Sequence, residues 1–218
     1  MSHLLPSLLR SVPSFPDDLP AFGVGEAPED PVDLFEGWLS QAIDAGVLAP
    51  HAMTLSTSGP DGVVTARTLI LKDIDERGWV FASRDDGVKA RDLGANPFAA
   101  LTFFWPALGR QVRVTGPVRQ LPQADGEADF LARPPESRAA AFVGHQSEPL
   151  GSREEYAAAY ADAVARLAEN PRLVARTWNT WAVAADTVEF WQASPDRAHV
   201  RLQYRLHNRA WERGLLWP

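Results

Sequence analysis

The chain has 218 residues, of which 45% are hydrophobic and 22% are charged, and this balance excludes intrinsic disorder over its whole length. A formal net charge of −7 disfavours a general nucleic-acid binder, because such a protein needs basic surface to displace counterions from the phosphates. The absence of cysteine excludes disulfides, thiol nucleophiles and cysteine-ligated zinc.

The beginning of the chain gives no sign of export or membrane insertion. No apolar run approaches the ~18 residues that a membrane-spanning helix needs. Residues 1–13 are mildly apolar but lack the basic start and the small-residue cleavage site of a signal peptide. We therefore predict a cytoplasmic protein in which residues 1–30, rich in proline and acidic side chains, form an extended N-terminal arm. Residues 31–218 contain no linker or internal repeat and are predicted to form a single domain.

The first predicted helix begins at Pro31, which directly follows Asp30. Aspartate before a helix and proline in its first turn are typical of a helix N-terminus. Apolar residues recur at helical spacing from Leu34 to Ile43, and Gly46 is expected to end the helix.

After this helix, hydrophobic residues alternate as they do in strands. A hairpin is predicted around the turn Gly59-Pro60-Asp61-Gly62, and a short helix over 88–93. The predicted strands of this part are 51–58, 63–72, 79–83, 98–105 and 111–121. Antiparallel strands with such short connections indicate a closed or partly closed β-barrel.

The remaining third is helical at first and then returns to strands. Alanine-rich helices are predicted over 124–132, 136–143 and 153–169. The last predicted strands are 179–185, 188–192, 199–205 and 210–215. The whole pattern predicts an α+β fold, mainly antiparallel β, with a barrel core and surrounding helices.

Several kinds of chemistry lack their motifs. The histidines show none of the spacings of a metal site, so we predict no bound metal. No Gly-x-Ser-x-Gly nucleophile motif, GxGxxG fingerprint or Walker loop occurs. Chemistry without a metal or a nucleophile points to an organic cofactor.

The basic residues are strongly biased, because 19 are arginine and only Lys72 and Lys89 are lysine. Arg67 and Lys72 stand at the two ends of an apolar run in the strand predicted over 63–72, and residue parity puts these two cations on opposite faces of that strand. Lys89 follows Ser83 in a polar turn that enters a helix, where a phosphate could be held. The alternative for Arg67 and Lys72 is that both side chains simply reach solvent from the strand. The alternative for the Lys89 turn is an ordinary solvated turn.

A second group of candidates lies in the C-terminal half. Gln111 stands in an alternating strand and could bind a polar heterocycle or simply face solvent. Arg197, His199 and Arg201 would share one strand face if their segment is extended. Such a face is costly to bury without an anionic or aromatic ligand.

Together these segments resemble the FMN-dependent pyridoxine/pyridoxamine 5′-phosphate oxidases and the similar phenazine-biosynthesis flavin oxidases. The resemblance covers about residues 31–218. It is carried by RTLILK (67–72), the Lys89 turn, RQVRVTG (110–116), ARPPES (132–137), HQS (145–147), EFWQ (189–192) and RAHVR (197–201). Each motif alone is weak, but all of them in this order are specific.

The resemblance implies an FMN-binding split β-barrel that forms a homodimer with two FMN sites at the subunit interface. The residues that it implies for the cofactor are Arg67, Leu69, Ile70, Lys72, Ser83, Lys89, Gln111, Gln146, Ser147, Trp191 and Arg201. Among these, Arg67 and Lys89 would bind the FMN phosphate. For the substrate phosphate it implies Lys72, Arg133 and Ser137, and for the substrate ring Arg197 and His199, which would be the catalytic pair.

The implied reaction is the oxidation of pyridoxine or pyridoxamine 5′-phosphate to pyridoxal 5′-phosphate. A hydride would pass from substrate C4′ to flavin N5, and O2 would reoxidise the flavin and give hydrogen peroxide.

The chain departs from the family pattern at several places. Val88 replaces a second cation in the phosphate turn, and Asp129 stands where a phosphate-binding tyrosine is usual. The C-terminal Arg-Leu-Ala-Pro signature appears here as Leu-Leu-Trp-Pro over 215–218, and the N-terminal arm is acidic instead of basic. These departures concern the substrate more than FMN.

The sequence is also compatible with other functions. One is an oxidase of the same fold that acts on a reduced phenazine-like or other unphosphorylated ring. Another is a non-catalytic protein that binds FMN or pyridoxal phosphate. A deazaflavin-dependent or haem-binding relative fits less well, because the cluster of Trp191, Arg197 and His199 belongs to the oxidases.

Overall fold

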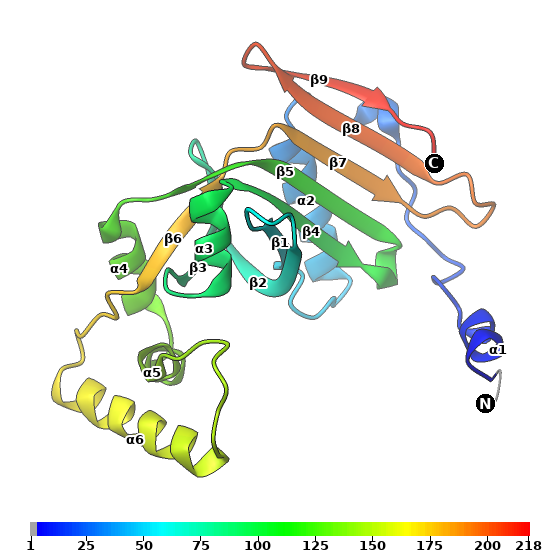
Figure 1. The fold of residues 1–218 in the computed structure, drawn as a ribbon. Helices are drawn as coiled ribbons and strands as arrows, with labels where there is room; N and C mark the ends of the chain where they lie inside the picture. The colour runs from blue at the N-terminus through cyan, green and yellow to red at the C-terminus, as the bar shows by residue number, and fades with distance from the viewer. Residues whose placement is uncertain (1–3) are drawn as a thin grey trace. The chain divides into compact units, whose positions relative to one another are not determined.

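The computed structural model describes residues 4–218 (Figure 1). The chain divides into two compact units. The first unit contains residues up to 52 together with 102–114 and 186–218, and the second contains 53–101 and 115–185. Strands β4 (Phe98–Trp105) and β5 (Arg110–Gln120) contribute residues to both units.

The first unit combines a helix with the last strands of the chain. In order, its own elements are α1 (Leu4–Ser11), the 3₁₀ turn η1 (Val24–Glu26), α2 (Pro31–Asp44), the 3₁₀ turn η2 (Pro106–Leu108), β7 (Thr187–Gln192), β8 (Val200–His207) and β9 (Ala210–Leu215). Its strands follow the order β5-β7-β8-β9, and β8 pairs antiparallel with both of its neighbours (Figure 1).

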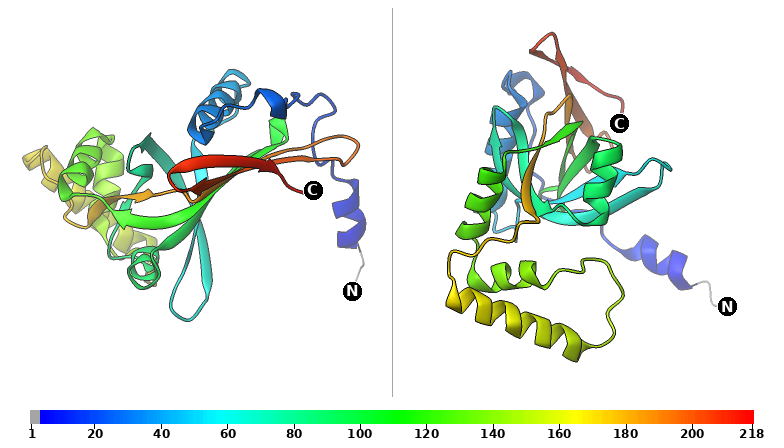
Figure 2. Two further views of the ribbon diagram at one scale, coloured as in Figure 1. Left: turned by 90° about the horizontal axis from the view of Figure 1, so that it is seen from above. Right: turned by 60° about the vertical axis from the view of Figure 1, so that its left-hand side comes forward.

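The second unit contains the central strands and most of the helices. Its elements are β1 (Ala52–Ser58), β2 (Val64–Asp75), β3 (Gly78–Arg84), α3 (Val88–Ala95), α4 (Gln123–Ala132), α5 (Pro135–Val143), α6 (Arg153–Glu169) and β6 (Trp178–Val183). The strand order is β1-β2-β3-β6-β5, with antiparallel pairing of β3 to β2 and of β6 to β3 and β5. Helices α5 and α6 lie side by side and share a small apolar core of Ala139, Ala163 and Leu167 (Figure 2).

The predicted α+β class with mainly antiparallel strands is confirmed, and the helix and strand positions agree to within two residues at most ends. Asp30 caps α2 as expected, since its side chain accepts a hydrogen bond of 2.8 Å from the Val32 N–H. The arm was predicted to be extended, but Leu4–Ser11 is a helix. The hydrophobic repeat of this short segment is helical, Pro6 lies in its first turn, where proline is tolerated, and Pro13 follows the end of the helix. The division into an arm (1–30) and one domain (31–218) stays a prediction.

Aromatic side chains form the core of the first unit. Phe35 and Trp38 from α2 pack against rings from the strands, with Phe35 4.8 Å from Phe103 and Trp38 5.2 Å from Phe190. Arg110 belongs to the same core. It is 2% exposed, and its guanidinium carbon lies 4.3 Å from the centroid of the Trp38 ring. Its guanidinium donates to the side-chain oxygens of Gln41 and Gln192, and burial lowers the pKa of Arg110 to about 10.

A bulge in β2 lies next to Lys72. Leu71 pairs with Phe81 and Asp73 with Val80, so that Lys72 is the extra residue between two consecutive partners on β3. The burial of side chains alternates along β2 as far as Lys72, and the bulge interrupts this alternation only at Asp73. Arg67 and Lys72 therefore keep opposite faces of the strand, as residue parity predicts.

Within residues 4–218, no helix combines the length and the apolar character needed to cross a bilayer.

The cap of α2 can be tested by mutation. We expect Asp30→Ala to lower the free energy of unfolding by about 1 kcal/mol, because the Val32 N–H loses its acceptor. Asp30→Asn keeps an acceptor and is expected to retain most of the stability. Chemical denaturation measures both, and equal stability of the alanine variant and the wild type would contradict a stabilising cap.

Candidate functional site

Two cations lie close together in the second unit, one on β2 and one on α3. Lys89 is 6% exposed, and its Nζ donates a hydrogen bond of 2.8 Å to Oε1 of Gln146. Burial lowers the pKa of Lys89, and the nearby charge of Arg67 lowers it further. Burial also lowers the pKa of Arg67. Two partly desolvated cations that repel each other form a site suited to a phosphate.

A hydrogen-bonded network holds Arg67 in place. Its guanidinium donates to the hydroxyl oxygens of Thr57, at 2.8 Å, and Thr65, at 2.5 Å. Both hydroxyls donate in turn to the same carboxylate oxygen of Asp92, at 2.7 and 2.9 Å. The Asp92 charge thus opposes the effect of burial on the pKa of Arg67 without contacting the guanidinium directly. The guanidinium of this half-buried arginine also donates a hydrogen bond of 3.3 Å to the Leu55 carbonyl.

The turn before α3 is shaped around Lys89. A Cβ atom at Gly87 would lie 2.9 Å from Oε1 of Gln146 and 3.5 Å from Nζ of Lys89, so a side chain there would displace this pair. Ser83, four residues before Gly87, is buried, and its hydroxyl donates to the Arg84 carbonyl. Ser147 is exposed and has a φ of 69°.

The two aspartates of this turn have partners of their own. Asp86 pairs with Arg84, and Asp85 accepts a hydrogen bond of 2.6 Å from Asn179. Burial raises the pKa of Asp85. Both carboxylates are therefore engaged by protein partners. The prediction that this turn holds a phosphate requires such partners for them.

A cavity of about 410 Å³ in the same unit brings several candidate residues together. It is lined by Thr68, Leu69, Ile70, Lys72, Ala82, Asp129, Ala132, Arg133, Pro134, Ser137 and Trp178. The three residues predicted for a substrate phosphate, Lys72, Arg133 and Ser137, are therefore in one cavity. Two residues predicted to lie along the flavin, Leu69 and Ile70, line it as well.

Asp129 stands among the cations of this cavity. Its Oδ1 lies 3.0 Å from Nζ of Lys72, and its Oδ2 accepts a hydrogen bond of 2.8 Å from Nε1 of Trp178. Arg133 stacks on the Trp178 ring at 3.8 Å. Burial lowers the pKa of Arg133, while the charge of Asp129 opposes this effect.

The first unit places Trp191 and His199 in ring contact, with centroids 4.9 Å apart. His199 Nδ1 accepts a hydrogen bond of 3.0 Å from the Ser194 N–H, which leaves Nε2 as the nitrogen for a ligand.

The prediction that Arg197, His199 and Arg201 share one strand face is wrong for Arg197. This residue lies in a tight turn with a φ of 68°, and β8 begins only at Val200. Asp196 stabilises the turn, because its carboxylate accepts hydrogen bonds from the Ser194 hydroxyl and the Ala198 N–H. The exposed Arg197 is thus presented by a turn before the strand.

A buried carboxylate holds Arg201. Glu189, 5% exposed, contacts Arg201 at 2.9 Å and pairs also with Arg113. Arg201 donates a further hydrogen bond to the Trp217 carbonyl. The half-buried Gln111 lies on β5, two residues before Arg113.

The N-terminal arm lies against the Trp191 group within this unit. The Phe15 ring is 5.6 Å from that of Trp191. A cavity of about 540 Å³ has walls from residues of the arm and from Ser194, Pro195, Arg197 and His199. The arm thus contacts Trp191, which was predicted for the cofactor, and lines one cavity with Arg197 and His199, which were predicted for the substrate ring.

Sequence reasoning missed three contributors to these groups. Asp92 was not singled out, Trp178 was not recognised as the partner of Asp129, and Glu189 was only part of a motif. Their partners are separated from them by 12 to 76 residues in the chain, so no local spacing reveals them.

Two family models match the chain. The model described as "Pyridoxamine 5′-phosphate oxidase" covers residues 39–165, and the one described as "Pyridoxine 5′-phosphate oxidase C-terminal dimerisation region" covers 178–218. The chain is 43% identical over 194 residues to the pyridoxine/pyridoxamine 5′-phosphate oxidase of Thermosynechococcus vestitus, covering 88% of this chain and 91% of the relative. The corresponding enzyme of Actinobacillus succinogenes is 41% identical, with 87% and 90% covered.

Solved structures show the same fold. PhzG from Burkholderia lata, solved with tetrahydrophenazine-1-carboxylic acid, has a TM-score of 0.86 and 27% identity, covering 92% of this chain and 99% of the other. A pyridoxamine 5′-phosphate oxidase-related, FMN-binding protein from Nostoc punctiforme has a TM-score of 0.69 and 16% identity, covering 90% and 100%. The fold is thus that of the split β-barrel flavoproteins, as predicted. Within this class, the chain belongs to the pyridoxamine 5′-phosphate oxidase family, and the predicted type of enzyme, a flavin-dependent oxidoreductase, is confirmed.

The Glu189 group makes stability depend on pH. Burial raises the pKa of Glu189, but hydrogen bonds from Arg201 and Arg113 lower it more, so the pKa lies below its ordinary value of 4.5. A carboxylate with a lower pKa in the folded state stabilises the fold above its unfolded pKa. This contribution is lost as the pH falls through the folded value.

We therefore expect Glu189→Gln to lower the free energy of unfolding at neutral pH by about 2 kcal/mol, since it leaves two arginines without their counter-ion. The difference from the wild type should shrink as the pH falls below 4.5. Denaturation over a pH series measures it, with the exposed Glu212→Gln as control. A difference that is constant with pH would contradict this role.

Proposed function

We propose that the protein is an FMN-dependent oxidase that converts pyridoxine or pyridoxamine 5′-phosphate to pyridoxal 5′-phosphate. The observation that carries the proposal is the pair of partly desolvated cations Arg67 and Lys89, in a chain about 40% identical to oxidases named for this reaction. A phosphate monoester carries close to two negative charges at neutral pH, which matches the charge of the pair.

The residues present fit FMN. Lys89 and Arg67 would hold its phosphate, with Ser83 alongside and with Gln146 and Ser147 at the edge of the same turn. Leu69, Ile70 and Lys72 would lie along the flavin, and Gln111, Trp191 and Arg201 would complete the site. In this site FMN would supply the two-electron oxidation of substrate C4′, as hydride acceptor through N5, with O2 as the final electron acceptor and hydrogen peroxide as product.

The protein's own part in this reaction is to bind and orient the substrate. Lys72, Arg133 and Ser137 would bind the substrate phosphate in the 410 Å³ cavity. Arg197 and His199 would bind the substrate ring, with the guanidinium polarising the ring oxygen and the imidazole fixing the ring plane. These groups orient the substrate for hydride transfer. The hydroxyl proton that pyridoxine 5′-phosphate loses as the aldehyde forms would pass to water.

A homodimer fits the match of residues 178–218 to the dimerisation region of the family. We propose that each FMN site is shared between two subunits and that the enzyme works in the cytoplasm. The small-molecule substrate and O2 are then the partners of the reaction.

A second candidate is an oxidase of the same fold that acts on an unphosphorylated ring, such as a reduced phenazine. The contact of 3.0 Å between Asp129 and Lys72 favours it, because a carboxylate already neutralises a cation of the cavity. The structural similarity to PhzG is consistent with this alternative.

The first experiment is the visible spectrum of the purified protein, followed by addition of pyridoxine 5′-phosphate in air. We expect a yellow protein that forms the aldehyde product. A yellow protein that leaves this compound unchanged would favour the second candidate if it oxidises an unphosphorylated ring, and a non-catalytic binding protein if it oxidises neither. A colourless protein that does not take up FMN would contradict both oxidase proposals.

Arg197→Ala tests the assignment of the substrate ring. We expect kcat/KM for pyridoxine 5′-phosphate to fall at least about 100-fold while FMN remains bound, because the polarising guanidinium is lost. Arg205→Ala, an exposed arginine on β8, is the control and should retain activity. Activity of Arg197→Ala close to that of the wild type would remove Arg197 from the mechanism.

Lys89→Met tests the cofactor phosphate separately from turnover. We expect the dissociation constant of FMN to rise about tenfold or more, since a charge-assisted hydrogen bond is lost, while that of riboflavin stays nearly constant. Fluorescence titration of the apoprotein measures both, with Arg91→Met on the same helix as control. An equal loss for the two flavins would show that Lys89 does not bind the phosphate.

A further inference from the structure

The cavity next to β2 contains an anion as well as two cations. Lys72 and Arg133 each contribute one positive charge to its lining, and Asp129 contributes one negative charge. The Asp129 carboxylate is 3.0 Å from Nζ of Lys72, close enough to be its counter-ion in the absence of any ligand. The net formal charge of these three side chains is therefore +1, whereas a phosphate monoester carries close to −2 at neutral pH.

The position of Asp129 is constrained by its surroundings. Its second oxygen accepts the indole N–H of Trp178 at 2.8 Å, and only 16% of its side chain is exposed. Turning the carboxylate away from the cavity would leave that indole N–H without its partner, at a cost in free energy. The carboxylate therefore remains beside any ligand that enters.

Arg133 is the cation with capacity left for a ligand. Its guanidinium stacks on Trp178 at 3.8 Å, and its buried Nη1 has no hydrogen-bond partner among residues 4–218. A single anionic or polar group of the ligand can satisfy this donor. A dianion must in addition compete with Asp129 for Lys72 and accept the repulsion of that carboxylate.

We propose that Asp129 is a specificity-determining residue of this cavity. As a permanent counter-ion of Lys72, it weakens the binding of the phosphate and leaves the binding of the ring unchanged. The cavity then discriminates less between phosphorylated and unphosphorylated pyridine substrates than its two cations alone would. This proposal rests on the proposed function, in which the cavity binds the phosphate end of the substrate.

The test compares two ligands that differ only in the phosphate, 4-deoxypyridoxine 5′-phosphate and 4-deoxypyridoxine. Neither carries the oxidisable group at C4′, so calorimetry on the FMN-loaded protein reports binding alone. Asp129→Asn removes the charge and keeps an oxygen for the indole N–H of Trp178. We expect this variant to bind the phosphorylated ligand about tenfold more tightly and the unphosphorylated one within about twofold of the wild type.

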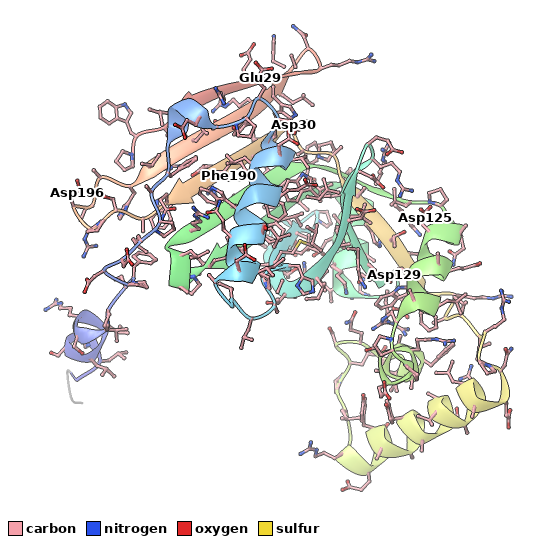
Figure 3. All side chains as sticks on the ribbon, turned by 180° about the vertical axis from the view of Figure 1, so that it is seen from behind. Glu29, Asp30, Asp125, Asp129, Phe190 and Asp196 are labelled. Carbon is pink, nitrogen blue, oxygen red and sulfur yellow. The ribbon has the colours of Figure 1, made fainter. Side chains whose placement is uncertain are left out.

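Asp125→Asn is the matched control. Asp125 lies one helical turn before Asp129 on α4 and pairs with Arg77 instead of a cavity residue (Figure 3). Its substitution removes the same charge from the same helix but outside the cavity lining, so both affinities should stay close to the wild-type values. An equal gain in the two variants would mean a general charge effect and would overturn the specific role of Asp129.

The remaining outcomes separate this proposal from the proposed function. If Asp129→Asn binds the phosphorylated ligand as weakly as the wild type or more weakly, the role of Asp129 is overturned. The same conclusion follows if the variant does not bind this ligand at all. If the variant binds it more tightly but the wild type does not oxidise pyridoxine 5′-phosphate, the specificity role stands and the proposed reaction fails.

Discussion

The candidate site depends on keeping positive charges partly buried without neutralising them completely. Lys89 and Arg67 illustrate the constraint, because burial lowers both pKa values and the two charges repel each other. The protein supports them with neutral or indirect partners. Gln146 accepts from Lys89, and two threonines stand between Arg67 and the Asp92 carboxylate. A direct carboxylate partner would satisfy each cation better but would also occupy the place of a phosphate.

The same problem is solved differently elsewhere in the chain. Arg110, fully inside the first unit, has two glutamines and the face of Trp38 as partners and no carboxylate within hydrogen-bonding distance among the described residues. Arg201 is instead paired directly with Glu189. Lys72 is also paired directly, with Asp129, although the family resemblance places it toward flavin and substrate. Lys89 and Arg67, which have no direct carboxylate partner, therefore keep more charge for a ligand than Lys72 and Arg201 do.

Local patterns predicted most of the fold. The N-cap of α2, the hairpin strands and the helices after residue 123 follow from capping residues and hydrophobic period, and the structure agrees with them. The error at Arg197 occurs where a side-chain contact overrides local preference. The Asp196 side chain folds residues 194–198 into a turn, which removes Arg197 from the strand. This turn does not change the hydrophobic pattern from which strands are predicted.

The sequence by itself determined the class of fold, the family and the residue types available for binding, since these depend on local periodicity and on motifs of a few residues. The presence of Asp129 in place of a tyrosine was also visible in it. Only the tertiary structure decided what Asp129 does, because its two partners lie 57 residues before it and 49 after it in the chain. Charges that are so far apart in the sequence come together only through the packing of strands and helices. Their pairing then decides which cations remain free to bind a ligand.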